Sequence, residues 1–116
     1  MRNAPDFNSL LGLRPGPDAE SVELVARAPD HAIGGSWVHM AVLTTLGEVA
    51  AARAAGGGVI PAALHAVFLK PAPLGLLRAR GRLLARGRRL CTAEGEVFSG
   101  ETLVAKVTVS FAVSAV

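Results

Sequence analysis

The stretch VHMAVLTTLGEVAAARAA, residues 38–55, is apolar along almost its whole length and would make about five turns of helix. Its length and its alanines favour a helix over a strand. Ser36 is a suitable N-cap, and the three glycines at 56–58 are typical of a helix end. A helix that is apolar on nearly every side belongs in the interior of a protein. We therefore expect residues 38–55 to form one central helix.

Near the middle of this predicted helix lies a single carboxylate, Glu48. An unpaired ionised carboxylate in a dry core is very costly, so Glu48 must be paired, protonated or close to water. Thr44 and Thr45 lie one turn earlier and offer hydrogen bonds, whereas Arg53 is poorly placed five residues later. Two interpretations stay open. Glu48 is an acid at an exposed edge or bonded to a threonine, or it is a general base or nucleophile in a partly desolvated cleft.

The whole chain, residues 1–116, is short enough to form one domain. Its hydrophobic fraction of 51% is enough for a real core. Only 18% of the residues are charged, which leaves apolar surface for a partner, and self-association is the simplest one. Residues 1–19 form an N-terminal extension, within which Asp6–Leu13 is predicted to be a short helix. No secretory signal is recognisable there, and Glu48 and Arg53 argue against a membrane span. We expect a soluble, cytoplasmic protein without a membrane partner.

Five runs have the composition of strands. They are Glu20–Ala28, Val59–Lys70, Leu74–Ala85, Arg88–Phe98 and Thr102–Val113. Turn signals separate the last four runs, at residues 71–73, 86–87 and 99–100. The chain is therefore predicted to contain about five antiparallel strands and one long helix.

The last three runs can be aligned as two hairpins, with one turn near Gly87 and the other at 99–100. In this register Arg80 faces Glu94, and Glu94 faces Lys106. Even-numbered positions then form a charged face, and odd-numbered positions form an apolar face that is rich in small residues. Small residues allow a helix to approach closely. The prediction is an α+β fold in which a curved antiparallel sheet wraps around the helix at 38–55.

Six arginines without an intervening acid lie between positions 78 and 89, in a chain of net charge +3. They are Arg78, Arg80, Arg82, Arg86, Arg88 and Arg89. Such a cluster suits a phosphate-bearing ligand or a nucleic acid, and a salt-bridged sheet face is the alternative. With four Phe, one Trp and no Tyr, the chain offers little base stacking, so we do not expect a nucleic-acid partner.

The cysteine and histidines indicate neither a disulfide nor a metal site. Cys91 is the one cysteine and is expected to be a small core residue. His31, His39 and His65 do not form a recognisable set of metal ligands with Cys or carboxylates. His31 is expected to serve loop structure, and Trp37 is expected to pack at the entrance of the helix.

Residues 39–50, HMAVLTTLGEVA, resemble the motif H-G-G-x-x-x-x-L-x-D/E-x-A of the hotdog-fold acyl-CoA thioesterases. The phenylacetate-pathway and 4-hydroxybenzoyl-CoA types are the most similar. The separation of His39 from Glu48 matches, and so does Leu46. Similarity continues through three further segments, FLKPA at 68–72, GRRLCTAEGEVF at 87–98 and LVAKVTVSF at 103–111. The order and spacing of these pieces, over roughly residues 30 to 113, carry the resemblance.

The resemblance implies a hotdog fold and the hydrolysis of acyl-CoA or aryl-CoA thioesters, without a cofactor. The thioester carbonyl would meet the backbone N–H of Met40 at the start of the helix, where the helix dipole stabilises an oxyanion. Glu48 would attack the carbonyl carbon or activate water. His39 would act at the same point, either as a catalytic group or by bonding a loop carbonyl. The site would lie between two subunits of a homodimer or homotetramer.

Further positions are implied by the same resemblance. The substrate would contact Thr45, His65, Phe68 and Ile33, with His65 and Phe68 on the opposite wall of the cleft. The CoA phosphates would be held by Lys70 together with Arg86, Arg88 and Arg89.

The sequence also departs from the motif. Met40 and Ala41 replace its two glycines, Ile33 stands where relatives often have Asn or Gln, and Ala52 stands where they often have Ser or Thr. These changes leave open weak activity, specialisation for an apolar acyl group, or loss of activity. A non-catalytic acyl-CoA or lipid-binding protein is therefore the main alternative to a hydrolase. A nucleic-acid-binding protein is the third class, and steep salt dependence would identify it.

Overall fold

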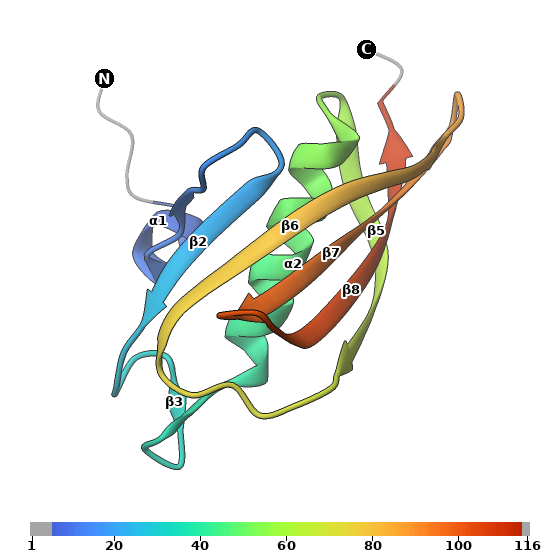
Figure 1. The fold of residues 1–116 in the computed structure, drawn as a ribbon. Helices are drawn as coiled ribbons and strands as arrows, with labels where there is room; N and C mark the ends of the chain where they lie inside the picture. The colour runs from blue at the N-terminus through green and yellow to red at the C-terminus, as the bar shows by residue number, and fades with distance from the viewer. Residues whose placement is uncertain (1–5, 115–116) are drawn as a thin grey trace, which may run out of the picture.

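The computed structural model describes residues 6–114, and it consists of one antiparallel sheet packed against one main helix (Figure 1). The elements are α1 (Phe7–Leu11), β1 (Arg14–Pro15), β2 (Ser21–Ala26), β3 (Ala32–Ile33), β4 (Trp37–Val38), α2 (Met40–Ala55), β5 (Val59–Phe68), β6 (Gly75–Arg86), β7 (Leu90–Ser99) and β8 (Thr102–Val113). The sheet order is β1-β2-β6-β7-β8-β5, and β3 pairs with β4 separately. The predicted α+β architecture is confirmed.

The core lies between α2 and the inner face of the sheet. The helix buries the side of its surface formed by Val42, Leu43, Leu46, Gly47, Ala50, Ala51 and Ala55. The facing strands bury odd-numbered positions, among them Leu77, Ala79, Cys91, Ala93, Val97, Ala105, Val107, Val109 and Phe111. The predicted division of the sheet into an apolar and a charged face is therefore confirmed, and Cys91 is a core residue as expected.

Two glycines show why the helix can lie so close to the sheet. A Cβ atom on Gly81 of β6 would overlap the carbonyl oxygen of Ala50. A Cβ atom on Gly95 of β7 would overlap the carbonyl oxygen of Gly47. Backbone of α2 therefore contacts backbone of the sheet, as the small residues of the inner face predicted.

The predicted strands are confirmed as β2, β5, β6, β7 and β8, with ends that differ by at most two residues. The predicted pairing of the charged residues is wrong by two positions. Arg80 lies opposite Glu96, Arg82 lies opposite Glu94, and Lys106 lies opposite Glu96. The turn between β6 and β7 is centred near residue 88, and each hairpin contains a register shift next to its turn. A slip of two residues keeps each side chain on its face, so the faces were still predicted correctly.

The main helix begins two residues later than predicted. Trp37 and Val38 form β4, and the Val38 amide donates a hydrogen bond to the carbonyl of Ala72. The N-cap is therefore His39 and not Ser36. Its backbone is extended and its ring accepts a hydrogen bond from the amide of Ala41. At the other end Gly56, with φ of 88°, is the C-cap, in agreement with the glycines at 56–58.

The N-terminal extension contains the predicted short helix and a sixth strand that was not predicted. Asp6 caps α1, and Gly12, with φ of 100°, ends it. Residues 1–5 of the extension lie outside the described residues. Strand β1 has two residues, one of them proline, which is too short a run to be recognised in a sequence.

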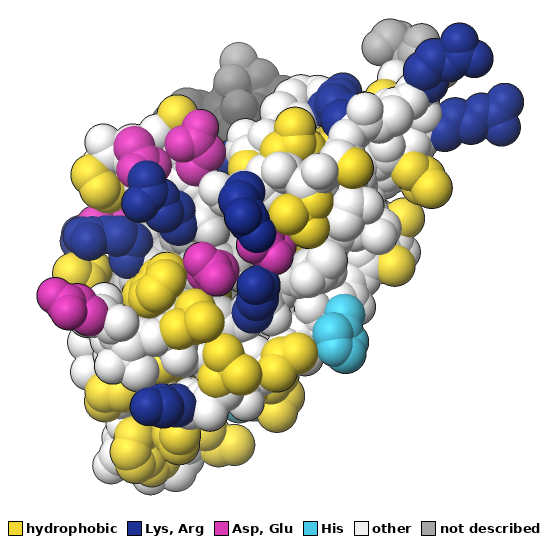
Figure 2. Space-filling model, turned by 45° about the vertical axis from the view of Figure 1, so that its right-hand side comes forward, with side chains coloured by type: hydrophobic (Ala, Val, Ile, Leu, Met, Phe, Trp, Pro, Cys, Tyr) yellow, Lys and Arg dark blue, Asp and Glu magenta, His cyan; other side chains and the backbone are white. Residues whose placement is uncertain are grey.

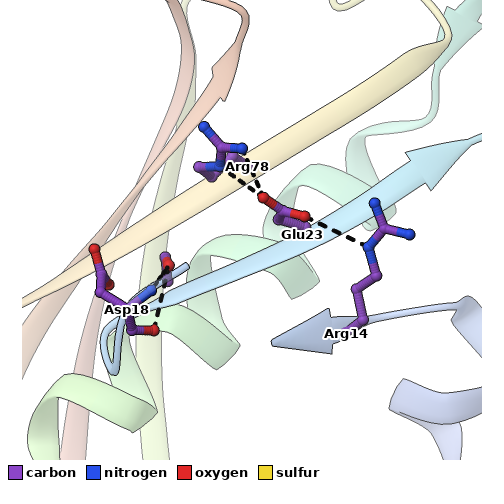
Figure 3. Close-up of polar contacts among 5 residues, drawn as sticks. Arg14, Asp18, Glu23 and Arg78 are labelled. Atoms are coloured by element: carbon purple, nitrogen blue, oxygen red, sulfur yellow. Dashed lines mark hydrogen bonds and ion pairs between the residues drawn. The ribbon is translucent and has the colours of Figure 1, made fainter. Parts of the chain in front are cut away.

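Side chains hold this extension against the sheet. Glu23 of β2 accepts a hydrogen bond from Arg78 at 2.7 Å and forms an ion pair with Arg14 at 3.5 Å (Figure 3). The hydrogen bond from Arg78 lowers the pKa of Glu23 below its ordinary value. His31 is buried, and its ring bonds the Arg27 amide and the Leu11 carbonyl, which is the loop role that the sequence suggested.

Among the described residues, none of the helices has the length and apolar content needed to cross a bilayer.

Candidate active site

The first turn of α2 presents an open backbone donor. The Ala41 amide donates to Nδ1 of His39 at 2.9 Å, and the Val42 amide donates to the His39 carbonyl at 3.0 Å. The Met40 amide has no hydrogen-bond partner within residues 6–114. The start of a 16-residue helix carries partial positive charge, so this N–H can receive an oxygen that develops negative charge.

His39 organises this turn. Nδ1 of the ring accepts this hydrogen bond, which leaves Nε2 as the ring nitrogen that can donate one. The backbone amide of His39 donates to the carbonyl of His31 at 2.8 Å. The ring thus bonds a helix amide and not a loop carbonyl, which corrects one of the two roles considered for His39. The capping ring leaves the preceding amide, that of Met40, as the available donor.

An apolar pocket of about 410 Å³ adjoins this turn. It is lined by Ile33, Trp37, Val38, His39, Met40, Leu43, Phe68, Leu69, Lys70, Pro71 and Ala72. Its walls come from the β3–β4 ribbon, the first turn of α2 and the segment after β5. An isolated bridge between Trp37 and Pro73 joins two of these walls. The volume suits a small organic ligand.

Glu48 is half-buried on α2. Its carboxylate has no hydrogen bond or ion pair within the part of the chain that the structure describes. The hydroxyls of Thr44 and Thr45 donate to the carbonyls of Met40 and Ala41, at 2.9 and 2.8 Å. The interpretation of Glu48 as bonded to a threonine is therefore wrong. Burial raises the pKa of Glu48 above its ordinary value, as in a carboxylate held partly away from water.

Glu48 and Met40 are well separated within one chain. Eight residues of helix correspond to about 12 Å along the axis. Glu48 does not line the pocket beside Met40. A single chain therefore presents its open amide and its unpaired carboxylate at two different points of α2.

The structure brings together part of the predicted site. Five predicted residues line one pocket: Ile33, His39, Met40, Phe68 and Lys70. Thr45 and Glu48 lie further along α2. His65 lies opposite Thr108, on the face of the sheet that points away from α2, because its neighbour Ala66 lies opposite the buried Val107. His65 is therefore not brought to the wall on which Phe68 lies.

The sheet part of the arginine cluster is paired with acids. Arg78 pairs with Glu23 at 2.7 Å, Arg80 with Asp18 at 3.4 Å and Arg82 with Glu94 at 2.6 Å. Lys106 also pairs with the buried Glu94, at 3.4 Å. Acidic and basic side chains accordingly lie intermixed across this face (Figure 2). Of the two interpretations of the cluster, these residues fit the salt-bridged sheet face.

The arginines near the β6–β7 turn differ among themselves. Arg86 donates to the carbonyls of Ala55 at 2.6 Å and Gly57 at 3.2 Å, so its guanidinium caps the C-terminal end of α2. Arg88 and Arg89 have no ion pair among the described residues. They lie at the turn near the C-terminal end of α2, whereas Lys70 lies at the N-terminal end. One chain does not bring Lys70 and these arginines to one place.

The sequence did not predict six of the pocket residues, which are Trp37, Val38, Leu43, Leu69, Pro71 and Ala72. Trp37 was assigned to packing, yet 47% of it is exposed in the pocket wall. Position in the sequence could have identified them, because Trp37, Val38 and Leu43 flank the start of α2 and the other three lie within four residues after Phe68.

Comparison with known proteins identifies a family. The model of the thioesterase superfamily matches residues 35–106, which is more than half of the chain. A search of curated proteins finds no match.

Solved structures with the same fold include members related to phenylacetic acid degradation. A mutant of the phenylacetic acid degradation protein PaaI from Thermus thermophilus is 27% identical, with a TM-score of 0.82, over 91% of this chain and 96% of that one. A phenylacetic acid degradation-related protein from Ralstonia eutropha is 28% identical, with a TM-score of 0.76, over 97% and 92%.

A third structure, a Bacillus halodurans protein solved with CoA, is 24% identical, with a TM-score of 0.79, over 92% of this chain and 74% of that one. That likeness concerns the fold. The fold, the open helix start and the family match agree with the predicted hotdog architecture, and the chain belongs to the thioesterase superfamily.

Proposed function

We propose that the protein hydrolyses acyl-CoA thioesters, aryl-CoA thioesters included, at the N-terminus of α2. The observation that carries this proposal is the Met40 amide, which has no partner among the described residues and begins a 16-residue helix beside an apolar pocket. A thioester carbonyl has its oxygen, its acyl group and its sulfur in one plane. The amide would take the oxygen while the pocket takes an adjoining apolar part of the substrate.

The Met40 amide stabilises the transition state. As a nucleophile adds to the carbonyl carbon, negative charge develops on the oxygen, and a hydrogen bond to that oxygen becomes stronger. The partial positive charge at the helix start adds to this effect. The cap by His39 supports this role because it holds the neighbouring amide in place and leaves that of Met40 open.

Glu48 supplies the base or the nucleophile. As a base it takes a proton from water, whose oxygen bonds to the carbonyl carbon. The tetrahedral intermediate then collapses, the carbon–sulfur bond breaks, and the CoA thiolate takes up a proton from the glutamic acid. As a nucleophile the Glu48 carboxylate adds to the carbonyl carbon, and the carbon–sulfur bond breaks so that the CoA thiolate leaves and an anhydride forms. Water then hydrolyses the anhydride to the free acid and the Glu48 carboxylate, and the proton released goes to the thiolate. Burial raises the pKa of Glu48 toward neutral pH, and a base whose pKa is nearer the working pH transfers protons more effectively.

Two copies of the chain form the site in this proposal. Strand β5 is a ten-residue edge strand whose outer rim has no partner strand in the described chain. It exposes apolar side chains, with Ile60 at 61%, Leu64 at 47% and Val67 at 41%. A long apolar edge pairs readily with another strand, and a second β5 related by a twofold axis would pair antiparallel.

This dimer would resolve the distance between Met40 and Glu48. Because the two groups are about 12 Å apart on one helix, one chain cannot apply both to one carbonyl. Twofold pairing of β5 makes the two α2 helices run in opposite directions. The carboxylate that acts at the Met40 amide of one copy would then be Glu48 of the other.

The same arrangement would serve CoA. In one chain Lys70 and the β6–β7 turn lie at opposite ends of α2, and antiparallel pairing turns the Arg88 and Arg89 of a second copy toward Lys70. Basic side chains at the rim suit the CoA phosphates. The fold has been seen with CoA in the Bacillus halodurans protein.

Thiol release tests the proposed function. The purified protein is supplied with short, medium and aromatic acyl-CoAs, and free CoA thiol is measured with a thiol reagent. Release well above the uncatalysed rate is expected, together with a large loss in the Glu48→Gln variant. A protein that releases no thiol from any member of the panel would not be a thioesterase, and undiminished release by Glu48→Gln would remove the role of Glu48.

A non-catalytic acyl-CoA-binding protein is the second candidate. It is favoured by Met40, whose side chain is 57% exposed at the pocket where the resembling motif has glycine. Calorimetry distinguishes the two, because CoA or acyl-CoA binding without turnover would support this candidate and not the hydrolase.

A further inference from the structure

Within one chain, the side chains that line the pocket beside Met40 offer no strong hydrogen-bond acceptor. Nine of its eleven lining residues carry apolar side chains: Ile33, Trp37, Val38, Met40, Leu43, Phe68, Leu69, Pro71 and Ala72. The two lining residues with polar side chains are His39 and Lys70. Nδ1 of His39 already accepts the Ala41 amide, and the remaining Nε2–H and the Lys70 ammonium are donors.

Part of the backbone around the pocket is occupied as well. The Val38 amide and the Ala72 carbonyl bond each other at 2.9 Å. The amides of Leu69 and Lys70 both donate to the carbonyl of Val104, at 2.8 and 3.3 Å. The Met40 amide remains, and the proposed function assigns it to the thioester oxygen.

We propose that this pocket holds the acyl group and selects apolar acyl groups that carry no hydroxyl, such as phenylacetyl or medium-chain alkyl groups. This inference rests on the proposed function. A hydroxyl on the acyl group would lose its water and find no side-chain acceptor for its proton. An aromatic ring would instead contact Trp37, Phe68 and the thioether of Met40.

Ile33 and Met40 determine this specificity. Both side chains are exposed in the pocket wall, at 55% and 57%, so an apolar acyl group would cover apolar surface that water now contacts. An asparagine side chain at position 33 would offer an acceptor for a hydroxyl, and isoleucine does not.

The test compares matched substrates. Values of kcat/KM are measured for phenylacetyl-CoA against 4-hydroxyphenylacetyl-CoA, and for hexanoyl-CoA against 6-hydroxyhexanoyl-CoA. An apolar pocket discriminates against an added hydroxyl by a factor on the order of 10 to 100, so the unsubstituted member of each pair is expected to be faster by that factor. Equal values of kcat/KM within each pair would overturn the inference. A higher kcat/KM for glutaryl-CoA than for hexanoyl-CoA would overturn it as well.

Variants at position 33 provide the control. Ile33→Asn adds an acceptor and is expected to lower the ratio within each pair toward one, whereas Ile33→Val keeps the wall apolar and leaves the ratio high. Because Ile33 is an exposed residue of the short strand β3, both variants are expected to fold. A ratio that Ile33→Asn does not change would assign the selectivity to another part of the protein.

Trp37 separates this inference from the proposed function. It is the one tryptophan of the chain and lines the pocket. Its fluorescence therefore measures ligand binding directly, whether or not the ligand is hydrolysed. Tighter binding of phenylacetyl-CoA than of its hydroxylated partner, without thiol release, would refute the hydrolase and retain the apolar acyl pocket. Thiol release with equal binding and equal rates would retain the hydrolase and refute the selectivity.

Discussion

Glu48 is a half-buried acid without a partner among the described residues, and the sequence alone already marked it as unusual. What the sequence could not decide is whether a threonine holds it, because that depends on side-chain rotamers. Both threonines prefer the helix carbonyls one turn back. The structure therefore excludes the threonine-bonded interpretation, and the reactive carboxylate stays a proposal beside an acid at an exposed edge.

Glu48 predicts a pH profile. Its pKa is raised by burial, so the ionised form that acts as base or nucleophile appears at a higher pH than for an ordinary glutamate. We expect kcat/KM to rise with pH through this raised pKa, and Glu48→Gln to lower kcat/KM by about 10²–10⁴-fold and to remove the rise. Rates from pH 4 to 8 are the measurement, and a profile that is already flat at the ordinary glutamate pKa would contradict the assignment.

The same burial predicts an effect on stability. A carboxyl whose pKa is higher in the folded than in the unfolded state binds more protons when folded, so its ionisation lowers the free energy of unfolding as pH rises through that range. Glu48→Gln is therefore expected to be at least as stable as the wild type at pH 7, with the difference vanishing below the unfolded pKa. Urea titrations at several pH values measure this, and a Gln variant clearly less stable at pH 7 would mean that Glu48 has a stabilising partner.

Met40 predicts a contrast between two substitutions. Met40→Pro removes the amide proton, and proline suits the first position of a helix that follows an extended residue such as His39. Met40→Ala keeps the amide and removes the side chain. We expect Met40→Pro to lower kcat by about 10²–10³-fold and Met40→Ala to keep kcat within a few-fold. Circular dichroism checks the helix, and equal effects of the two substitutions would show that the amide is not the oxyanion donor.

At the scale of elements, the long helix and the four long strands after it could be predicted because their patterns run over ten or more residues. The register of the strand pairs could not be predicted. It depends on the position of each turn and of each β-bulge. The register shifts at Leu83/Ala85 and Val97/Phe98 cannot be recognised from the alternation of apolar and charged residues. The start of α2 was missed for a similar reason. Trp37 and Val38 satisfy a helical pattern as well as a strand pattern, and pairing with β3 decides between them.

The contact between α2 and the sheet predicts the effect of added methyl groups. Gly81→Ala and Gly95→Ala would each place a Cβ atom on a backbone carbonyl of α2. Neither the helix nor the strand can relieve this overlap by moving a side chain, because the contact is with backbone atoms. We expect each to destabilise the fold by about 1–3 kcal/mol or more. Gly57→Ala is the control, because nothing lies within 4 Å of its added Cβ. Thermal or urea unfolding measures the difference, and a stable Gly81→Ala variant would contradict this packing.

At the scale of the whole molecule, the fold class follows from composition and pattern, but the site does not. The sequence placed both Met40 and Glu48 on the helix at 38–55, but it could not show that a pocket adjoins Met40 and that Glu48 lies outside its lining. The positions of Arg88 and Arg89 relative to Lys70 likewise depend on the curvature of the whole sheet. A cytoplasmic location and a tetrameric assembly stay predictions.

Strand β5 predicts the oligomeric state. The protein is expected to be at least a dimer by light scattering, and Leu64→Glu, which places like charges close together across the proposed twofold interface, is expected to shift it toward monomer. Leu10→Glu is the matched control. Leu10 is 74% exposed on α1, which precedes β1, and β1 is the edge strand opposite to β5. A Leu64→Glu protein that remains a dimer would place the interface elsewhere.

Mixing two inactive variants shows whether one hydrolytic site is shared between two copies of the chain. Met40→Pro chains and Glu48→Gln chains are co-expressed, and hybrids that carry both are purified through two different tags. In a hybrid, the intact Met40 amide of one chain meets the intact Glu48 of the other, so one site of two is complete. Purified hybrids are expected to recover about half of the wild-type thiol release per dimer, and unpurified random mixtures about a quarter, because half of their dimers are hybrids. Hybrids as inactive as either parent, with wild-type protein active, would contradict it.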